Sequence, residues 1–280
     1  MKKSFLLALA LAAGISGQSQ IQTPAPSPGS ELHQTVGLTE VVVNYSRPSM
    51  RGRTIFGDLV PYGAVWRTGA NMNTTVSFSD SVEVGGSQLA AGTYALYTKP
   101  GADQWEVYFY TDTNNGGLPR QWDADKVAAT VTATPVQMPM SVETFTITVD
   151  DLSNNGANLG ILWENTYVAV PFAVPTAAKA MQSIETTMGG PSGGDYFAAA
   201  SYYHDEGQDL AKAKQWIDKA TEMNPQAYWI WRRKSLIYAD SGDKKGAIEA
   251  AKKSLALATE ANNQDYVKMN RESLAEWGAK

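Results

Sequence analysis

The stretch "FTITVDDLSNNGANLGILWENTYVAVPF", residues 145–172, is the part of the sequence that most clearly decides the fold. Its large apolar residues occupy every second position, at Phe145, Ile147 and Val149 and again at Leu159, Ile161 and Trp163. Because successive side chains of a strand point to opposite faces, this alternation indicates two strands with one buried face each. The intervening Asn154-Asn155-Gly156 predicts a tight turn between them. We also expect the short polar run Glu164-Asn165-Thr166 to close a second hairpin.

The same period of two extends from Val36 to Val174, and no helical period interrupts it. Turn-forming residues separate the apolar runs, at Gly85-Gly86, Pro100-Gly101 and Asn114-Asn115-Gly116-Gly117. Parallel strands would need crossover helices, so many short strands without helices predict antiparallel sheets. We therefore expect residues 34–174 to form an antiparallel, jelly-roll-like β-sandwich.

Near Thr176 the apolar period changes to that of a helix. The glycine-rich run at 189–194 then breaks the chain, so we expect residues 175–194 to form one helix and a linker. From residue 195 to 280 the sequence repeats at an offset of 34 residues. This offset aligns Phe197 with Trp231, Ser201 with Ser235, His204 with Tyr238, and Ala213 with Ala247.

This spacing of aromatic and small residues resembles the tetratricopeptide repeat, in which two helices form a hairpin and hairpins stack. We therefore expect an all-α, tetratricopeptide-like C-terminal domain that serves protein interactions. Trp229 does not occupy a core position of the repeat, so it is a candidate contact residue for a protein partner.

The N-terminus has the pattern of an export signal. Lys2 and Lys3 precede an apolar run at 5–15 that is too short to span a bilayer, and small residues follow it. We predict a signal peptide over residues 1–19 and a flexible Pro/Ser-rich tether over 20–33. The mature protein is then periplasmic or extracellular and has no integral membrane segment.

The composition excludes several classes of protein. The 280 residues carry a formal net charge of -5 and include no cysteine. Disulfides, thiol catalysis, iron–sulfur clusters and cysteine-bound zinc are therefore excluded. Nucleic-acid binding requires a basic surface, so no nucleic-acid partner is expected.

The sequence also shows no catalytic signature. The chain has two histidines, His33 in the predicted tether and His204 at an aromatic repeat position, and no G-x-S-x-G motif. A Ser-His-Asp site is therefore not expected. The residues 112–123 weakly resemble a calcium loop, but Gly116 stands at a ligand position and no helices flank the loop. Neighbouring acids in loops are ordinarily solvated, and this applies to Asp123/Asp125 and Asp150/Asp151. We predict no catalytic residue, no metal and no cofactor.

A second stretch, "YSRPSMRGRTIFGDLVPYGAVWRTGAN" at 45–71, concentrates four of the eight arginines of this acidic chain. Arginine offers a planar fork of donors that suits carboxylates, phosphates and carbonyls in fixed geometry. One interpretation is a ligand site, with candidate residues Arg47, Arg51, Arg53, Tyr62, Trp66, Arg67 and Asn71. The other is a structural clamp, in which the same forks bind backbone carbonyls of a turn-rich connection, Asp58 or a distant glutamate. We favour the clamp, and the two roles can overlap.

The residues of this stretch resemble an uncharacterised family of exported bacterial domains. The matching pattern is a "YSRP" strand end, a "GR…FGDLVPYG…VWRTGAN" core, and a "LAAGTY" hairpin in which Ala90 replaces the usual proline. The resemblance covers residues 34 to 174 and implies a β-sandwich and an exported location. It implies no known substrate.

These observations favour an exported, non-catalytic binding or scaffold protein of the cell envelope, whose partner is an envelope protein, a peptide or a glycan. The alternative is a hydrolase or lyase with an arginine-lined site in the β domain. A third hypothesis is a purely structural role in envelope assembly.

Overall fold

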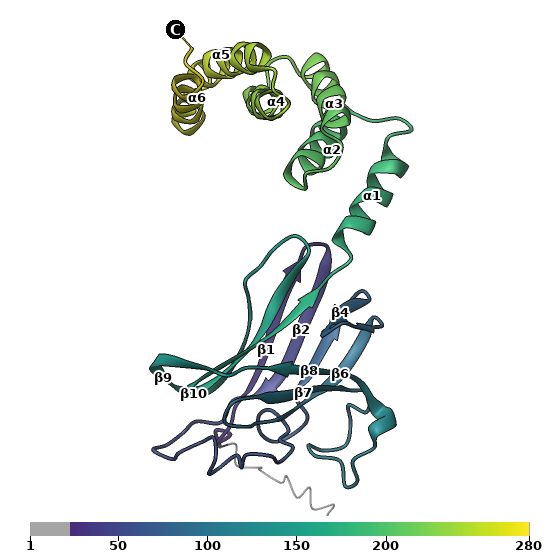
Figure 1. Ribbon diagram of the computed structural model, residues 1–280, viewed down its shortest axis with the longest axis vertical. Coiled ribbons are helices and arrows are strands. Elements are labelled where there is room, and N and C mark those ends of the chain that lie inside the picture. Colours follow the sequence, from purple (N-terminus) through teal and green to yellow (C-terminus); the bar gives the residue numbers. More distant parts are fainter. Residues whose placement is uncertain (1–22, 280) are drawn as a thin grey trace, which may run out of the picture. The chain divides into compact units, whose positions relative to one another are not determined.

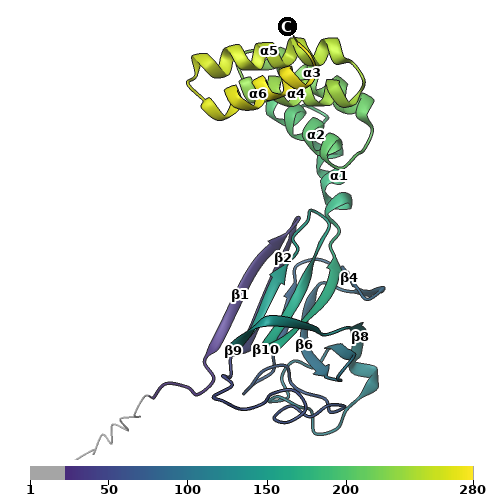
Figure 2. The same ribbon diagram turned by 60° about the vertical axis from the view of Figure 1, so that its left-hand side comes forward.

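The computed structural model describes residues 23–279, which divide into two compact units between Val174 and Pro175 (Figures 1 and 2). Residues 23–174 are called the β unit here, and residues 175–279 the helical unit. The predicted signal peptide, residues 1–19, and the first residues of the tether, 20–22, lie outside the described residues.

The strands of the β unit form two antiparallel sheets (Figure 1). The six-stranded sheet has the order β1-β2-β3-β6-β7-β8: β1 (Gly29–Val36), β2 (Thr39–Ser46), β3 (Thr75–Phe78), β6 (Gly92–Lys99), β7 (Trp105–Tyr110) and β8 (Val127–Ala133). The four-stranded sheet has the order β5-β4-β10-β9: β5 (Ser87–Leu89), β4 (Val82–Val84), β10 (Gly156–Ala173) and β9 (Val136–Asp150). A short 3-10 helix, η1 (Ala124–Lys126), precedes β8. The predicted antiparallel β-sandwich is confirmed.

Alternate apolar residues of both sheets form one buried core, as the sequence period predicted. Fully burying one such side chain stabilises the fold by about 1.5–3 kcal/mol. At one end of the core, five aromatic rings contact one another with centroids 4.8–6.4 Å apart: Phe56, Trp66, Trp105, Phe145 and Trp163. This aromatic cluster supports the connection between β2 and β3.

The expected hairpin at Glu164-Asn165-Thr166 is wrong. Strand β10 runs through these residues and pairs with β9 on both sides, at Leu162↔Thr146 and at Thr166↔Gln137. The register shifts on either side of Glu164, which has a φ of 54°. Three polar residues in a row suit a turn, but here they form a bulge that bends the strand without reversing it.

The tether prediction also fails for residues 29–33, which form the first part of β1. Gly29 pairs with Ser46, and His33 pairs with Val42. His33 is exposed on this strand, where its Nε2 lies 2.6 Å from Glu31 Oε1. β1 is an edge strand in which every second residue from Gly29 to Thr35 is exposed, so its polar sequence resembles that of a linker.

The two sheets are joined where the chain leaves β2 and continues along the edge of β9. Phe145 N donates to Pro48 O at 2.8 Å, and Met50 N donates to Glu143 O at 2.8 Å. Ser49 and Thr144 form an antiparallel bridge between these bonds. Residues 47–50 therefore satisfy backbone groups at the edge of the second sheet. Residues 45–50, which make this passage, are called the crossover.

Side chains reinforce the crossover. Arg47 Nε donates to Phe145 O at 3.0 Å, and its Nη2 donates to Thr146 Oγ1 at 2.7 Å. The Tyr45 hydroxyl accepts a further hydrogen bond from Ile147 N of β9, at 3.2 Å. Arg47 is thus a structural clamp between the two sheets.

The helical unit contains α1 (Thr176–Thr187), α2 (Gly193–Asp205), α3 (Leu210–Met223), α4 (Tyr228–Asp240), α5 (Lys244–Glu260) and α6 (Gln264–Glu276). The predicted all-α C-terminal region is confirmed, and its tetratricopeptide-like character stays a prediction. The last glycines of the expected linker, Gly193 and Gly194, instead open α2, because Ser192 and Asp195 form a reciprocal capping box there. Among the described residues, no helix combines the length and apolar character that a membrane span requires.

His204 lies between α2 and α4. Its Nε2 lies 2.7 Å from Asp240 Oδ2, and its Nδ1 lies 3.1 Å from Nη1 of Arg233. Arg233 also binds Asp205 through two nitrogens, at 2.6 and 3.3 Å. The imidazole thus links α2 to the charged side chains of α4.

We predict that Arg47→Met destabilises the β unit by about 1–3 kcal/mol, because the substitution keeps the aliphatic bulk and removes two donors from the crossover. Urea titration followed by tryptophan fluorescence measures this loss. The exposed Arg120, which lies outside the crossover, provides the control Arg120→Met, for which we expect a change below about 0.5 kcal/mol. Equal midpoints for both variants would show that the clamp contributes nothing.

Candidate functional site

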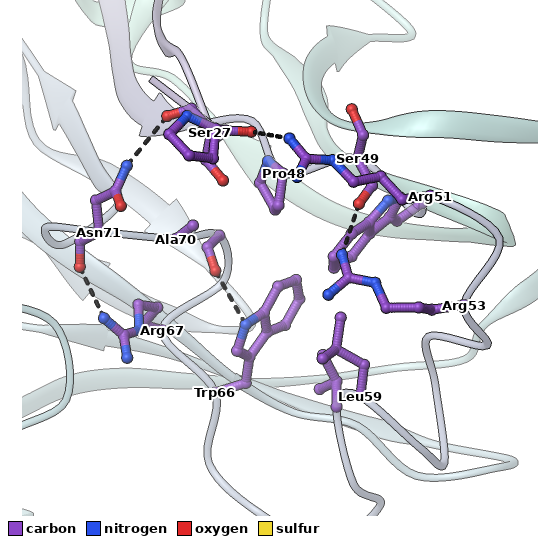
Figure 3. A pocket seen from close by; sticks show the side chains of 14 residues that line it. Ser27, Pro48, Ser49, Arg51, Arg53, Leu59, Trp66, Arg67, Ala70 and Asn71 are labelled. Atoms are coloured by element: carbon purple, nitrogen blue, oxygen red, sulfur yellow. Dashed lines mark hydrogen bonds between the residues drawn. The ribbon is translucent and has the colours of Figure 1, made fainter. Parts of the chain in front are cut away.

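A pocket of about 460 Å³ lies in the connection between β2 and β3 (Figure 3). Most of its wall comes from residues 48–71, and Pro26, Ser27 and Trp163 complete it. It is called the arginine pocket here. Its polar and aromatic lining consists of Ser27, Ser49, Arg51, Arg53, Trp66, Arg67, Asn71 and Trp163.

The pocket brings together five of the seven predicted site residues. Figure 3 shows Arg51 and Arg53 on one side and Arg67 and Asn71 on the other, with the indole of Trp66 between them. These residues lie up to 20 positions apart in the sequence, and the folded connection makes them neighbours.

The other two predicted site residues lie elsewhere. Arg47 does not line the pocket, because its guanidinium binds β9 as described above. Tyr62 is 49% exposed, and its ring packs over Gly57, where a Cβ atom would lie 2.8 Å from the ring. Gly63 N donates to Pro100 O at 2.8 Å, which holds this part of the connection beside the end of β6.

Main-chain carbonyls fix all three guanidinium groups. Nη2 of Arg51 donates to Pro26 O (3.0 Å), Nε and Nη2 of Arg53 donate to Met50 O and Ser49 O (both 2.8 Å), and Nη1 of Arg67 donates to Asn71 O (2.8 Å). These bonds are those of the predicted clamp. They leave further N–H donors on each fork, because a guanidinium carries five.

No carboxylate in the described part of the chain forms an ion pair with the arginines of the pocket. No acidic residue lines the pocket, and none of Arg51, Arg53 and Arg67 forms an ion pair there. Glu143 comes near, but its carboxylate accepts from the backbone N–H of Arg51, at 2.9 Å. The carbonyls that bind these guanidiniums carry only partial charges and do not neutralise them. Three positive charges therefore surround the arginine pocket of an acidic protein. Such a hollow attracts anions.

The backbone around the pocket adopts left-handed conformations that non-glycine residues rarely take. Arg51 has a φ of 51°, Thr68 of 53° and Asn71 of 60°. Asn tolerates this region because its side chain bonds locally, whereas Arg and Thr lose about 1–2 kcal/mol there. Strain of this kind persists where the surroundings impose it, and it often accompanies binding sites.

Trp66 forms the apolar wall of the pocket. Its ring stacks on Trp163 with centroids 5.9 Å apart and an interplanar angle of 18°, and its Nε1 donates to Gly69 O at 3.1 Å. Backbone bonds between Trp66 and Thr98 add this residue to the edge of β6. The indole is half-buried and rigid, so it is suited to contact a flat face of a ligand.

The loop between β7 and β8 supports the Arg67 side of the pocket, which the sequence did not indicate. The side-chain amide of Asn73 binds both backbone groups of Gly117. Asn73 Oδ1 accepts from Gly117 N, and Asn73 Nδ2 donates to Gly117 O, both at 3.0 Å. The hydroxyl of Tyr97 also donates to Gly117 O, at 2.6 Å. Burial raises the pKa of Tyr97, which keeps this hydroxyl protonated. Gly117 then lies directly against the guanidinium of Arg67.

The acidic residues of the faint calcium-loop pattern at 112–123 form an ion pair and a helix cap. Asp112 Oδ2 lies 3.0 Å from Lys126 Nζ, and this hydrogen bond holds the pKa of the Asp112 carboxyl below its usual range. Asp123 accepts from Asp125 N at 3.1 Å and caps η1. Within residues 23–279, no group of three or more acidic or histidine side chains is placed to hold a metal ion.

The remaining acid pair, Asp150 and Asp151, is occupied by neighbours on the four-stranded sheet. Asp150 Oδ2 accepts from Thr148 Oγ1 at 2.6 Å and from the Tyr167 hydroxyl at 3.2 Å. Asp151 Oδ2 accepts from Asn158 Nδ2 at 3.3 Å. These bonds are structural and hold the ends of β9 and β10 together.

In the helical unit, Trp229 lies on α4 with 44% of its surface exposed. Its ring contacts the edge of Tyr228 at 5.0 Å, and Tyr228 in turn contacts Tyr266 of α6 at 4.9 Å. The indole is therefore a surface group on an ordered aromatic base.

Comparison with protein families gives one match. A family described as "Protein of unknown function (DUF2911)" matches residues 27–172, which is almost the whole β unit. The resemblance to an uncharacterised domain family is confirmed at this level. A search of curated proteins finds no match to the chain.

We predict that Gly117→Ala displaces the guanidinium of Arg67. The new Cβ would lie 2.7 Å from Nη1 of Arg67 and 3.2 Å from Asn71 O, so it competes with the bond between them. The Nε–Hε resonance of Arg67 in NMR spectra reports this displacement.

Gly116→Ala is the matched control for Gly117→Ala. Gly116 also has a positive φ, of 73°, but a Cβ atom there has no neighbour within 4 Å. A Cβ atom at a positive φ strains the backbone in both variants, and we expect the Arg67 resonance to move in the Gly117 variant alone. An unmoved resonance in Gly117→Ala would contradict the role of this loop.

Proposed function

The chain belongs to the DUF2911 family, whose function is unknown, and we propose that its β unit is a binding module that captures a carboxylate or similar oxyanion in the arginine pocket. The observation that carries this proposal is the convergence of three guanidinium groups without a carboxylate partner in the pocket lining. The export pattern of the N-terminus supports a role in the cell envelope, outside the cytoplasm.

The clamp bonds of Arg53 and Arg67 to carbonyls of the connection favour binding of an anion. A guanidinium that is already fixed by a carbonyl loses little further side-chain freedom when it binds an anion. A bond from arginine to a carboxylate is charge-assisted and roughly twice as strong as a bond between neutral groups. Arg53 and Arg67 therefore combine fixed geometry with donors that suit an oxyanion, and Arg51 adds a third guanidinium to the same pocket.

The remainder of the wall indicates the shape of the ligand. Trp66 presents a flat aromatic surface, and Leu59 and Val60 add aliphatic contacts beside Arg53. A sugar ring or a short peptide fits such a wall, because its less polar face can lie on the indole while its acid group binds the arginines. An acidic glycan or a peptide with a free carboxyl terminus is the ligand that we propose.

Binding without catalysis is the function that the pocket supports best. General acid–base chemistry needs a carboxyl, imidazole or similar group at the reacting atom, and the lining residues include none. The hydroxyls of the lining are those of Ser27 and Ser49, and Ser49 Oγ is hydrogen-bonded to Thr144 Oγ1, at 3.1 Å. The hydrolase or lyase alternative therefore stays a prediction without support from the site.

We predict that Arg53→Gln and Arg67→Gln each weaken binding of D-glucuronate about tenfold or more, because each removes one charge-assisted contact. Isothermal titration calorimetry of the mature protein measures the affinity. D-Glucose, which lacks the carboxylate, shows whether the sugar ring alone binds. A dipeptide is measured with a free and with an amidated C-terminus, which shows whether a peptide carboxylate binds in place of an acidic sugar. Binding of the acid should weaken as salt increases.

Arg120→Gln is the control for these variants, because Arg120 is an exposed arginine of the β unit outside the pocket lining. We expect it to bind as the unchanged protein does. If the pocket variants and this control lose affinity equally, the effect is one of general charge. If the unchanged protein binds neither D-glucuronate nor the free-acid dipeptide, the proposal is lost.

For the helical unit, we propose a protein-interaction role with Trp229 as a contact residue, and the exposed indole on an ordered base supports it. Trp229→Ala should reduce capture of an envelope protein from membrane extracts at least fivefold, because exposed aromatic anchors dominate many interfaces. Capture is quantified by mass spectrometry against the unchanged chain. Trp277→Ala, at the C-cap of α6, is the control, and equal capture by all three chains contradicts the assignment.

A further inference from the structure

The segment just before β1 lies along the rim of the arginine pocket. It reads Thr-Pro-Ala-Pro-Ser-Pro at residues 23–28 and is called the strap here. Pro26 and Ser27 line the pocket. Figure 3 shows the side chains of Asn71 and Arg51 approaching the segment at Ser27 from opposite sides. A segment expected to be a free tether is therefore part of the site.

Three successive carbonyls of the strap accept hydrogen bonds from the connection between β2 and β3. Pro26 O accepts from Nη2 of Arg51 at 3.0 Å, and Ser27 O accepts from Nδ2 of Asn71 at 3.0 Å. Pro28 O accepts from Arg47 N at 2.8 Å. The first two donors belong to residues that line the pocket, so the strap occupies donors that suit an anion.

Burial contributes little to holding the strap. Its residues are exposed, except that Ser27 is half-buried, and they belong to no strand. The hydrogen bonds of Arg51 and Asn71 to the strap have neutral carbonyls as acceptors, which bind more weakly than an anion does. Proline restricts the free chain, so docking costs little conformational entropy. These features describe a segment that docks readily and that a stronger acceptor displaces.

We propose that the strap is an internal competitor of the anionic ligand, which occupies Arg51 and Asn71 until an oxyanion displaces it. This inference rests on the proposed anion-binding function and adds its regulation. While the strap is docked, it lowers the affinity of the pocket for ligands that offer a single neutral acceptor. Ligands that offer two or more acceptor oxygens displace it.

The experiment compares the full chain after the predicted signal, which begins at Gln20, with a shorter form that begins at Gly29. Both retain β1, and only the first has the strap. Binding of D-glucuronate and of inorganic sulfate is measured by calorimetry, and circular dichroism checks the fold. We expect the shorter chain to bind both anions roughly tenfold more tightly, because two donors are released.

A second variant avoids truncation. Replacing Pro24 and Pro26 by glycine in the longer chain increases the conformational freedom that docking must remove. We expect an affinity between those of the two chains. The peptide Thr-Pro-Ala-Pro-Ser-Pro, added to the shorter chain, should compete with both anions.

The outcomes separate the two proposals. Tighter binding by the shorter chain, reversed by the peptide, supports both. Equal binding by both chains, or weaker binding by the shorter one, overturns the competitor role while the anion site stands. If neither anion binds either chain, the anion site is lost, and the strap proposal is lost with it.

Discussion

The β unit depends on the main-chain hydrogen bonds by which the crossover, residues 45–50, passes from β2 to the edge of β9. Buried or edge-exposed amide and carbonyl groups need partners, and here the residues that follow β2 supply them to the edge of the second sheet. Arg47 strengthens the passage with two further bonds to β9. The chain leaves β2 at a fixed point as a result, and the path of the following connection starts from there.

The other end of that connection is fixed where Trp66 bonds to Thr98 on β6. Between these two anchors the chain makes turns that require positive φ, some at residues other than glycine. Such turns direct several carbonyls away from regular partners, and arginine forks bind them. The clamp bonds of Arg51, Arg53 and Arg67 therefore also shape the proposed ligand site, because the carbonyls that fix these guanidiniums hold them around one pocket.

Much of the fold could be predicted from local pattern. The alternation at Phe145, Ile147 and Val149 identified strands correctly, because burial of one face imposes a period of two. Glu164-Asn165-Thr166 was misjudged, since a bulge and a turn use the same polar residues and only pairing across β9 distinguishes them. Residues 29–33 were misjudged for a related reason, because an edge strand is polar enough to resemble a linker.

By itself the sequence determined the two kinds of unit, the strand and helix periods, and the selection of arginine in one connection, because these follow from local spacing and side-chain chemistry. Only the tertiary structure decided which arginines surround the pocket. Arg51 contacts Pro26, Asn71 contacts Ser27, and Arg67 lies against Gly117. These partners are distant along the chain. Local sequence patterns therefore do not predict which backbone carbonyls lie beside which arginine.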